Sequence, residues 1–102
     1  MRVRFLDQAN ADLIEHNEHY YMIGGAVLAR RMLACIKEPV LTLRNNPEIA
    51  PLYELAPGVR RLVVARGAFL VFYRIRADVE VLHIRRAERE PATADALEQR
   101  SP

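Results

Sequence analysis

Residues 59–86 carry the pattern that most constrains the fold, because they divide into three short strand-like runs separated by tight turns. The middle run, residues 68–76, is apolar on both faces, as is usual for a strand in the centre of a sheet. The runs on either side alternate more between apolar and polar residues, as half-buried strands do. Since Arg66-Gly67 and Ala77-Asp78 leave room only for hairpin turns, we predict a three-stranded antiparallel meander.

Residues 7–46 are predicted to form a helical hairpin. Apolar side chains recur at spacings of three and four on both sides of Gly24-Gly25, which is the pattern of one helix face. Glycine readily takes the left-handed conformation at a helix end, so the pair should separate two antiparallel helices. Pro39 removes a backbone donor from the second helix, and we expect either a kink near Cys35–Pro39 or two shorter helices there.

The two ends of the chain complete the prediction. Residues 1–6 alternate arginine with apolar residues, so they should form a strand that joins one edge of the sheet. In the tail, residues 90–102, a short helix could form over residues 92–100. The order β-α-α-β-β-β describes a single α+β domain spanning residues 1–102, with the helical hairpin packed on one face of a small antiparallel sheet.

The composition lacks the features of membrane, secreted and metal-binding proteins. No run approaches the roughly 18 apolar residues that a membrane span requires, and the first residues do not resemble a signal peptide. The one cysteine, Cys35, has no partner for an internal disulfide and no companions for a zinc site. We therefore expect a cytoplasmic protein that makes no membrane contact and uses no metal or other cofactor.

Charge is distributed unevenly, although the net charge is only +2. Residues 5–24 contain four acidic residues and no lysine or arginine, whereas residues 58–89 contain eight arginines and three acidic residues. A basic C-terminal half suits an anionic partner. Because the whole chain has fourteen arginines and one lysine, arginine-rich codon usage explains the same pattern equally well, and both interpretations stay open.

Five stretches, in order and with similar spacing, resemble the toxins of the RelE/ParE superfamily. They span about residues 3–90 and include a Pro-Gly-x-Arg-Arg-Leu sequence, a central apolar strand and a trailing arginine. The order of one strand, two helices and three strands also matches that superfamily. The stretches are Ala9 with Asp12-Leu13, Asn46-Pro47-Glu48, Pro57–Leu62, Phe69–Ile75, and Val79–Ile84 with the trailing Arg89.

The resemblance implies one of two activities, and the residues favour the one without catalysis. The RelE branch cleaves messenger RNA on the ribosome, which needs groups that move protons and neutralise charge on phosphate. Its catalytic set falls here on Arg60, Leu62, Phe69, Arg89 and Asp95, of which only the two arginines are basic. We therefore predict no catalytic residues and place the chain in the ParE branch, whose toxins inhibit DNA gyrase.

His83 is the residue for which catalysis has to be weighed, since other relatives use a histidine with a glutamate base. Strand alternation places His83 on the face of Val81 and Arg85, and Glu80 on the opposite face. The favoured interpretation is a half-exposed histidine that packs near an arginine. His16, on the apolar face of the first helix, is interpreted as a hydrogen-bonded core histidine.

Similarity to the ParE branch implies contacts with a target. Arginine pairs bidentately with carboxylate or phosphate, so we expect Arg85, Arg86 and Arg89, with the tail, to bind DNA gyrase. For each arginine the alternative is that it lines the solvated edge of the sheet or pairs with the acidic first helix. We expect no sequence-specific DNA binding by the toxin alone. The auxiliary candidates for target binding are Arg60, Arg61 and His83.

The resemblance also implies an antitoxin of ParD type, bound as a heterodimer or a higher heteromer. Its C-terminal segment would lay a helix on the hairpin and a strand on the sheet edge. We expect Tyr20, Tyr21 and Leu28 to bind it, because the hairpin has more large apolar residues than one buried face can use. Two alternatives stay open: a ribosome-dependent endoribonuclease of RelE type, and a non-toxic module that only binds antitoxin.

Overall fold

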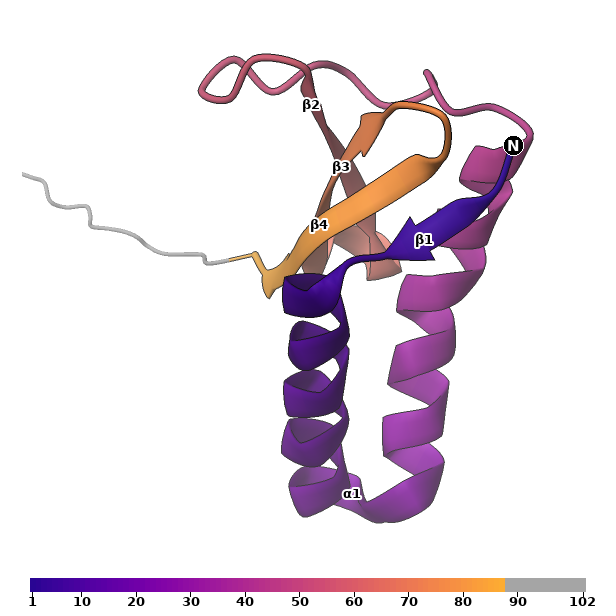
Figure 1. Cartoon of the computed structure of the whole chain (residues 1–102). Coiled ribbons are helices and arrows are strands. Elements are labelled where there is room, and N and C mark those ends of the chain that lie inside the picture. The colour runs from indigo at the N-terminus through magenta and orange to yellow at the C-terminus, as the bar shows by residue number, and fades with distance from the viewer. Residues whose placement is uncertain (88–102) are drawn as a thin grey trace, which may run out of the picture.

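The structure, a computed structural model, describes residues 1–87 and has the predicted α+β architecture (Figure 1). The helix that could form over residues 92–100 lies outside the described residues. The observed elements are β1 (Val3–Phe5), α1 (Asp7–Leu41), the 3-10 helix Thr42–Arg44, β2 (Val59–Val64), the 3-10 helix Ala65–Gly67, β3 (Phe69–Ile75) and β4 (Val79–Arg86).

The four strands form one sheet in the order β1-β4-β3-β2. β2, β3 and β4 pair antiparallel as predicted, because a tight turn reverses the chain between each strand and the next. β1 joins the edge of β4 as expected, but the two strands run parallel, with Val3 opposite Val79. No hairpin connects β1 to β4, so local chain geometry does not require an antiparallel pair. The sheet as a whole is therefore mixed.

α1 is a hairpin of two antiparallel helical arms that meet at Gly25 (Figure 1). We call residues 7–24 the first arm and residues 26–41 the second arm. Gly25 has φ 80° and ψ −169°, a backbone conformation that is open almost only to glycine. The division of the hairpin predicted at Gly24-Gly25 is therefore confirmed.

Gly25→Ala is expected to lower the free energy of unfolding by about 1–3 kcal/mol, the usual cost of such a conformation in a residue with a Cβ atom. No atom lies within 4 Å of the added Cβ, so the cost arises from the backbone and not from a clash. Urea denaturation followed by circular dichroism measures it. Ala26→Ser, at the next and exposed position, should change stability by less than about 0.5 kcal/mol. Equal losses in the two variants would contradict the backbone explanation.

Pro39 does not divide the second arm, so the two shorter helices that were one of the alternatives predicted near Cys35–Pro39 are not found. Within α1 only Gly25 has non-helical dihedral angles, and the helix continues past Pro39 to Leu41. A proline this close to a helix end removes a hydrogen bond from the last turns alone. Thr42 Oγ1 then donates a hydrogen bond of 2.6 Å to the Pro39 carbonyl and stabilises that end.

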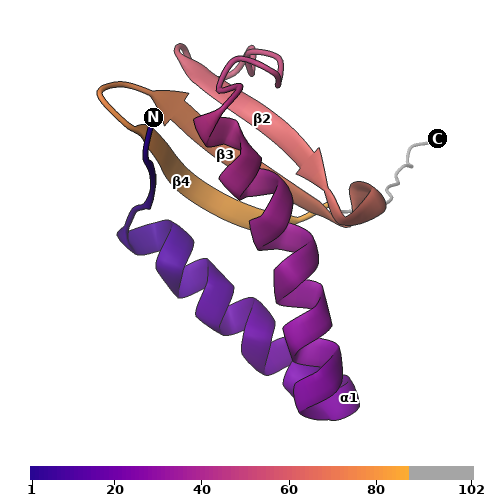
Figure 2. The ribbon, with the colours of Figure 1, turned by 90° about the vertical axis from the view of Figure 1, so that its right-hand side faces the viewer.

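The core lies between α1 and one face of the sheet (Figure 2). The second arm crosses this face, while the first arm runs beside β4. Alternate residues of β3 point into the core, and Phe69, Val71 and Tyr73 are fully buried there. Ile36 and Val40 of the second arm belong to the same apolar cluster. The opposite face of the sheet is covered by no helix of the described chain.

Residues 45–58 form an irregular connector between the 3-10 helix Thr42–Arg44 and β2, and hydrogen bonds attach it to the sheet. The hydroxyl of the buried Tyr73 donates a hydrogen bond of 2.7 Å to the Pro47 carbonyl. Two backbone hydrogen bonds cover the outer edge of β2, from the Tyr53 amide to the Val59 carbonyl (2.7 Å) and from the Arg61 amide to the Pro51 carbonyl (3.1 Å).

Burial raises the pKa of the Tyr73 phenol above its usual value of 10.0. The unfolded chain therefore loses this proton first, so the stability that the group contributes is fully present below about pH 10 and is lost above it. Tyr73→Phe should reduce stability by about 1 kcal/mol at neutral pH, through loss of the bond to Pro47, and should make the alkaline decline shallower. Urea titrations on either side of about pH 10 test both effects. The exposed Tyr21→Phe should keep the wild-type alkaline slope, and a Tyr73 variant with that slope would contradict the assignment.

Candidate functional site

A groove open to solvent runs between the two arms of α1. Two adjoining hollows of about 490 and 440 Å³ share Asn17, Leu33 and Lys37, so they form one continuous depression, which we call the inter-arm groove. Its lining contains no carboxylate, and its two cations, Arg30 and Lys37, both come from the second arm. Its larger apolar side chains are Leu13, Ile14, Tyr21 and Leu33.

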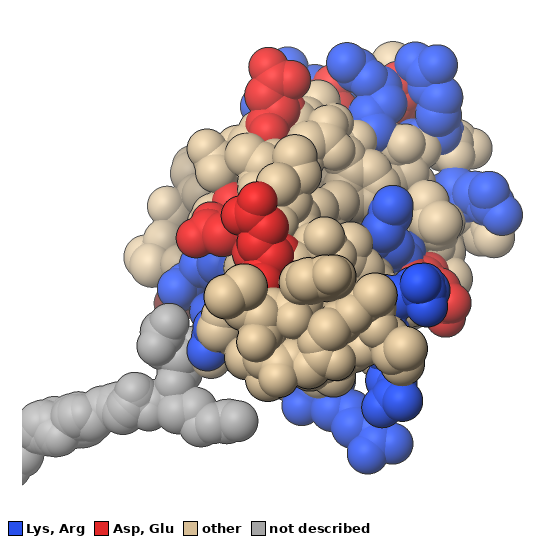
Figure 3. Space-filling view, turned by 90° about the horizontal axis from the view of Figure 1, so that it is seen from below, with Lys and Arg blue, Asp and Glu red and all other residues tan. Residues whose placement is uncertain are grey.

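The tip of the hairpin extends this groove with exposed apolar surface. Tyr21, Met22, Ile23 and Val27 expose 56, 84, 63 and 63% of their surface. The hairpin projects beyond the sheet (Figure 1), and in the view from below its end is an uncharged surface with charged side chains around it (Figure 3). Contiguous apolar surface of this kind on a small protein usually marks a contact with a partner.

Of the three residues predicted to bind an antitoxin, Tyr21 is the one that lies in the inter-arm groove. Tyr20 is half-buried at the margin of the core, where its ring packs edge-on against Phe69 with centroids 6.1 Å apart. Leu28 is half-buried as well. Ile14, which is 62% exposed, lines the groove in their place. Its position on the margin of the apolar stripe of the first arm is the sequence signal that could have found it.

A buried carboxylate joins the first arm to β4. Asp12 is 5% exposed, and its Oδ2 accepts hydrogen bonds from the Ile84 amide at 2.8 Å and from His83 Nδ1 at 2.6 Å. One turn further on, His16 Nε2 donates to the Ile84 carbonyl at 2.9 Å. β1 pairs with β4 only as far as Val81. Beyond that point Asp12 and His16 take the place of a neighbouring strand, because they bond the amide and the carbonyl of Ile84. We call Asp12, His16, His83 and Ile84 the polar lock.

The interpretation of His16 as a hydrogen-bonded core histidine is confirmed, because its side chain is buried and bonded within the polar lock. Asp12 has a third partner, since Gln8 Nε2 donates to its Oδ1 at 2.9 Å. Every oxygen of the buried carboxylate is therefore occupied by a donor, as a buried charge requires. The polar lock ties the first arm to the strand that carries the predicted target contacts.

A β-bulge sets the direction of His83. Val81 and His83 pair with two neighbouring residues of β3, so Leu82 between them has no partner. The extra residue reverses the alternation of β4, and His83 lies on the same face as Glu80 and Arg85, while Val81 points into the core. The prediction that His83 shares the face of Val81 and not that of Glu80 is therefore wrong.

His83 packs as a half-exposed strand histidine, in agreement with the favoured interpretation. Its ring stacks on Phe72, with centroids 6.1 Å apart and planes at 18°, and 42% of its side chain is exposed. The Arg85 guanidinium lies 5.8 Å from the centroid of the same Phe72 ring. The carboxylate that holds His83 is Asp12 of the first arm.

The arginines expected to bind the target lie on different faces at the end of β4. Arg85 is exposed on the face away from α1, over Phe72. Arg86 is exposed on the side of the first arm, where its Nη1 donates to His19 Nε2 at 2.9 Å. Arg89 lies outside the described residues. A single flat partner on one face of the sheet could therefore contact Arg85 or Arg86, but a partner at the strand end could contact both.

The two auxiliary arginines also have different surroundings. Arg60 Nη1 donates to the carbonyls of Ala50 and Glu48, at 2.7 and 3.3 Å, and so holds the connector against β2. Arg61 is exposed, and its guanidinium lies 5.6 Å from the centroid of the Tyr53 ring. Arg60 is therefore committed to the fold, whereas Arg61 is available to a partner.

Residues 1–87 contain no group of three or more His, Cys, Asp or Glu side chains that could hold a metal ion. Over the same residues, no helix combines the length and the apolar character needed to cross a membrane. Cys35 is exposed and forms no disulfide.

Comparison with known proteins decides the family. The family model described as the ParE toxin of the type II toxin–antitoxin system parDE matches residues 3–91. The chain belongs to the ParE toxin family. A chain of the chromosomal ParDE TA system from P. aeruginosa is similar in structure, with a TM-score of 0.78 and 29% sequence identity. The match covers 86% of this chain and 97% of that one. No curated protein matches the chain.

In this ParE chain three positions of the RelE catalytic set, Arg60, Leu62 and Phe69, lie within the described residues. Phe69 is fully buried and Leu62 packs against the core. Arg60 already donates to two backbone carbonyls. The remaining two positions, Arg89 and Asp95, lie outside the described residues.

Proposed function

We propose that this ParE chain is the toxin of a type II pair, that a ParD-like antitoxin neutralises it, and that its cytoplasmic target is DNA gyrase. The observation that carries the proposal is the inter-arm groove with its exposed apolar tip, found in a member of the ParE family. The proposal has two parts, an antitoxin contact and a target contact, which use different surfaces of the chain.

The shape and charge of the inter-arm groove suit the helix of an antitoxin. An amphipathic helix lays its apolar face into such a groove, and the exposed Ile14 and Tyr21 supply apolar surface that it would cover. Arg30 and Lys37 on the second arm favour acidic residues along one flank of that helix. The similar chain from P. aeruginosa belongs to a ParDE TA system, which supports an antitoxin of ParD type.

Membership of the ParE family and the basic end of β4 support the target contact. Arg85 and Arg86 are exposed, and within residues 1–87 neither pairs with a carboxylate. Neither guanidinium is neutralised by an acid there, so each has N–H donors for a carboxylate or a phosphate of the target, Arg86 through those that do not bond His19. Arg89, which follows in the sequence and lies outside the described residues, remains the third candidate for this contact. The apolar residues at two positions of the RelE set weigh against RNA cleavage.

A supercoiling assay with purified gyrase and the purified chain tests the target. We expect loss of supercoiling with accumulation of cleaved DNA, and recovery when the antitoxin is added in equal amount. In cells, replication should stop while transcripts stay intact. Cleavage of messenger RNA at codon positions would show that the target is the ribosome and not gyrase. The absence of any growth defect would show that the chain only binds antitoxin.

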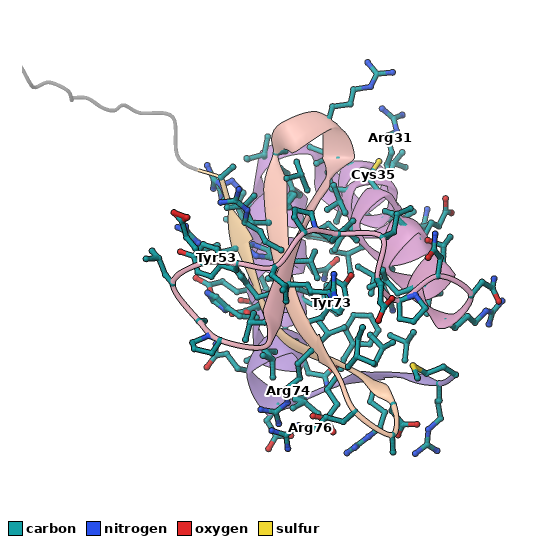
Figure 4. All side chains as sticks on the ribbon, turned by 90° about the horizontal axis from the view of Figure 1, so that it is seen from above. Arg31, Cys35, Tyr53, Tyr73, Arg74 and Arg76 are labelled. Carbon is teal, nitrogen blue, oxygen red and sulfur yellow. The ribbon has the colours of Figure 1, made fainter. Side chains whose placement is uncertain are left out.

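The double variant Arg85→Gln, Arg86→Gln should raise the concentration needed for half-inhibition of gyrase by about 10-fold or more, because a hydrogen bond to a charged group contributes about 1.5–3 kcal/mol. Both side chains are exposed, so the melting temperature should stay close to that of the wild type. Arg31→Gln is the matched control, because this exposed arginine stands on the second arm (Figure 4). Equal inhibition by the double variant and the control would exclude the end of β4 as the target contact.

A further inference from the structure

The sheet face opposite α1 carries aromatic rings and arginines. Cross-strand pairing places Arg61, Phe72 and His83 side by side on β2, β3 and β4, and Arg85 follows His83 on the same face. The connector brings Tyr53 over this face, beside the strands (Figure 4). We call these five residues the open face, since no helix of the described chain lies over them (Figure 2).

The rings and guanidinium groups of the open face form a continuous series of contacts. The Tyr53 and Phe72 rings meet edge-on, 5.1 Å apart, and Phe72 stacks on His83 at 6.1 Å. Arg61 Cζ lies 5.6 Å from the Tyr53 centroid, and Arg85 Cζ lies 5.8 Å from the Phe72 centroid. A guanidinium held against a ring has less freedom to lose when it binds a partner. The polar lock also restricts the motion of a ring on the open face, because Asp12 fixes the ring of His83.

The two arginines of the open face are not paired with an acidic side chain in the part of the chain that the structure describes. Within residues 1–87 neither Arg61 nor Arg85 forms an ion pair, whereas Arg74 on the same face binds Glu80 at 2.7 Å. Glu54 lines the same hollow of about 410 Å³ as Arg61 without pairing with it. The open face therefore presents two positive charges, one on either side of the central strand β3.

We propose that the open face binds single-stranded nucleic acid, with Arg61 and Arg85 on backbone phosphates and the half-exposed rings of Tyr53 and His83 against bases. Cations interleaved with ring faces on an open sheet are the combination that recognises single strands without sequence preference. An acidic peptide would use the cations but not the rings, and a duplex keeps its base faces stacked inside. This activity goes beyond gyrase inhibition, because it requires no protein partner.

Fluorescence anisotropy with labelled oligothymidine and oligouridine of about twelve nucleotides measures this binding directly. We expect dissociation constants of about 1–100 µM near physiological salt, the range of binding without sequence preference. Each phosphate contact on a single strand adds roughly −0.7 to the slope of log K against log salt concentration. Arg61→Gln, Arg85→Gln should therefore weaken binding at least about 10-fold and reduce the slope by about 1.4. Arg31→Gln should keep the wild-type affinity and slope.

Tyr53→Ala separates stacking from charge. It should weaken binding by about 5-fold or more while the salt slope stays near its wild-type value, and Tyr53→Phe should restore the affinity. Melting curves of each variant show that it is folded. No binding at about 0.1 mM in low salt would overturn the proposal, since that is the weak end of non-specific affinity. Two other results would also overturn it. One is equal affinity of the double variant and Arg31→Gln for the oligonucleotides, and the other is that the wild type binds an oligoglutamate of the same charge as tightly as an oligonucleotide. Gyrase inhibition is measured in a separate assay, so failure of either proposal can be told from failure of the other.

Discussion

Asp12→Leu is expected to lower the melting temperature of the chain by about 10–20 °C. The substitution removes the acceptor of the buried Ile84 amide and of His83 Nδ1. A buried donor without an acceptor costs about 1–3 kcal/mol, and in a domain of this size 1 kcal/mol corresponds to roughly 4–8 °C. The first arm would also lose one of its attachments to the end of β4, although the bonds of His16 to Ile84 and of Arg86 to His19 remain, so inhibition of gyrase should weaken as well. Thermal unfolding followed by circular dichroism measures the effect on stability.

Two further variants make the result interpretable. Asp12→Asn keeps one carbonyl oxygen and should fall between the wild type and Asp12→Leu, because that oxygen cannot serve every donor equally. Glu15→Leu replaces an exposed carboxylate on the same arm and should change stability by less than about 0.5 kcal/mol. A melting temperature of Asp12→Leu within a few degrees of the wild type would show that the polar lock does not stabilise the fold.

The double variant Ile14→Asp, Tyr21→Asp should raise the dissociation constant for the cognate antitoxin by about 100-fold or more. The two side chains are 62 and 56% exposed in the free toxin, so the fold should tolerate the change. Covering a large apolar side chain contributes about 1.5–3 kcal/mol, and each 1.4 kcal/mol is a factor of ten in affinity. The new carboxylates would also lose hydration in an apolar groove. Isothermal titration calorimetry with the antitoxin measures the loss.

The control for the groove variant adds the same charge elsewhere. Ala11→Asp, Ala77→Asp changes two exposed positions outside the inter-arm groove and should bind antitoxin as the wild type does. The groove variant should still inhibit gyrase, so cells that also make the antitoxin should stop growing. Unchanged antitoxin affinity in the groove variant would show that the antitoxin does not bind in the inter-arm groove.

Much of the fold could be predicted because its signals are local. The apolar run of β3 and the tight turns beside it predicted the antiparallel meander, and Gly24-Gly25 predicted the division of α1. The direction of β1 was not predictable in this way. It pairs with β4, which lies more than seventy residues away along the chain, so no turn sequence reports whether the strands run parallel.

The candidate site was only partly predictable, because its contacts join distant segments. Tyr21 was expected at a partner surface and lines the inter-arm groove. Asp12 was missed, although a carboxylate on the apolar face of the first arm is an unusual residue there. Its partner His83 is 71 positions away, and neither residue indicates the other. Arg60 was predicted as an auxiliary candidate for target binding, and in the structure its guanidinium donates to two carbonyls of the connector.

The amino-acid sequence by itself determined the kind and order of the elements, since hydrophobic periodicity, glycine conformations and turn residues act over a few positions. The five stretches that resemble the family are short and local as well. The tertiary structure alone decided which side chains meet. One unpaired residue, Leu82, turned His83 to the open face, and the approach of the first arm to β4 brought Asp12 to it. That outcome depends on how helix and strand pack, and packing is set by the whole core rather than by any one segment.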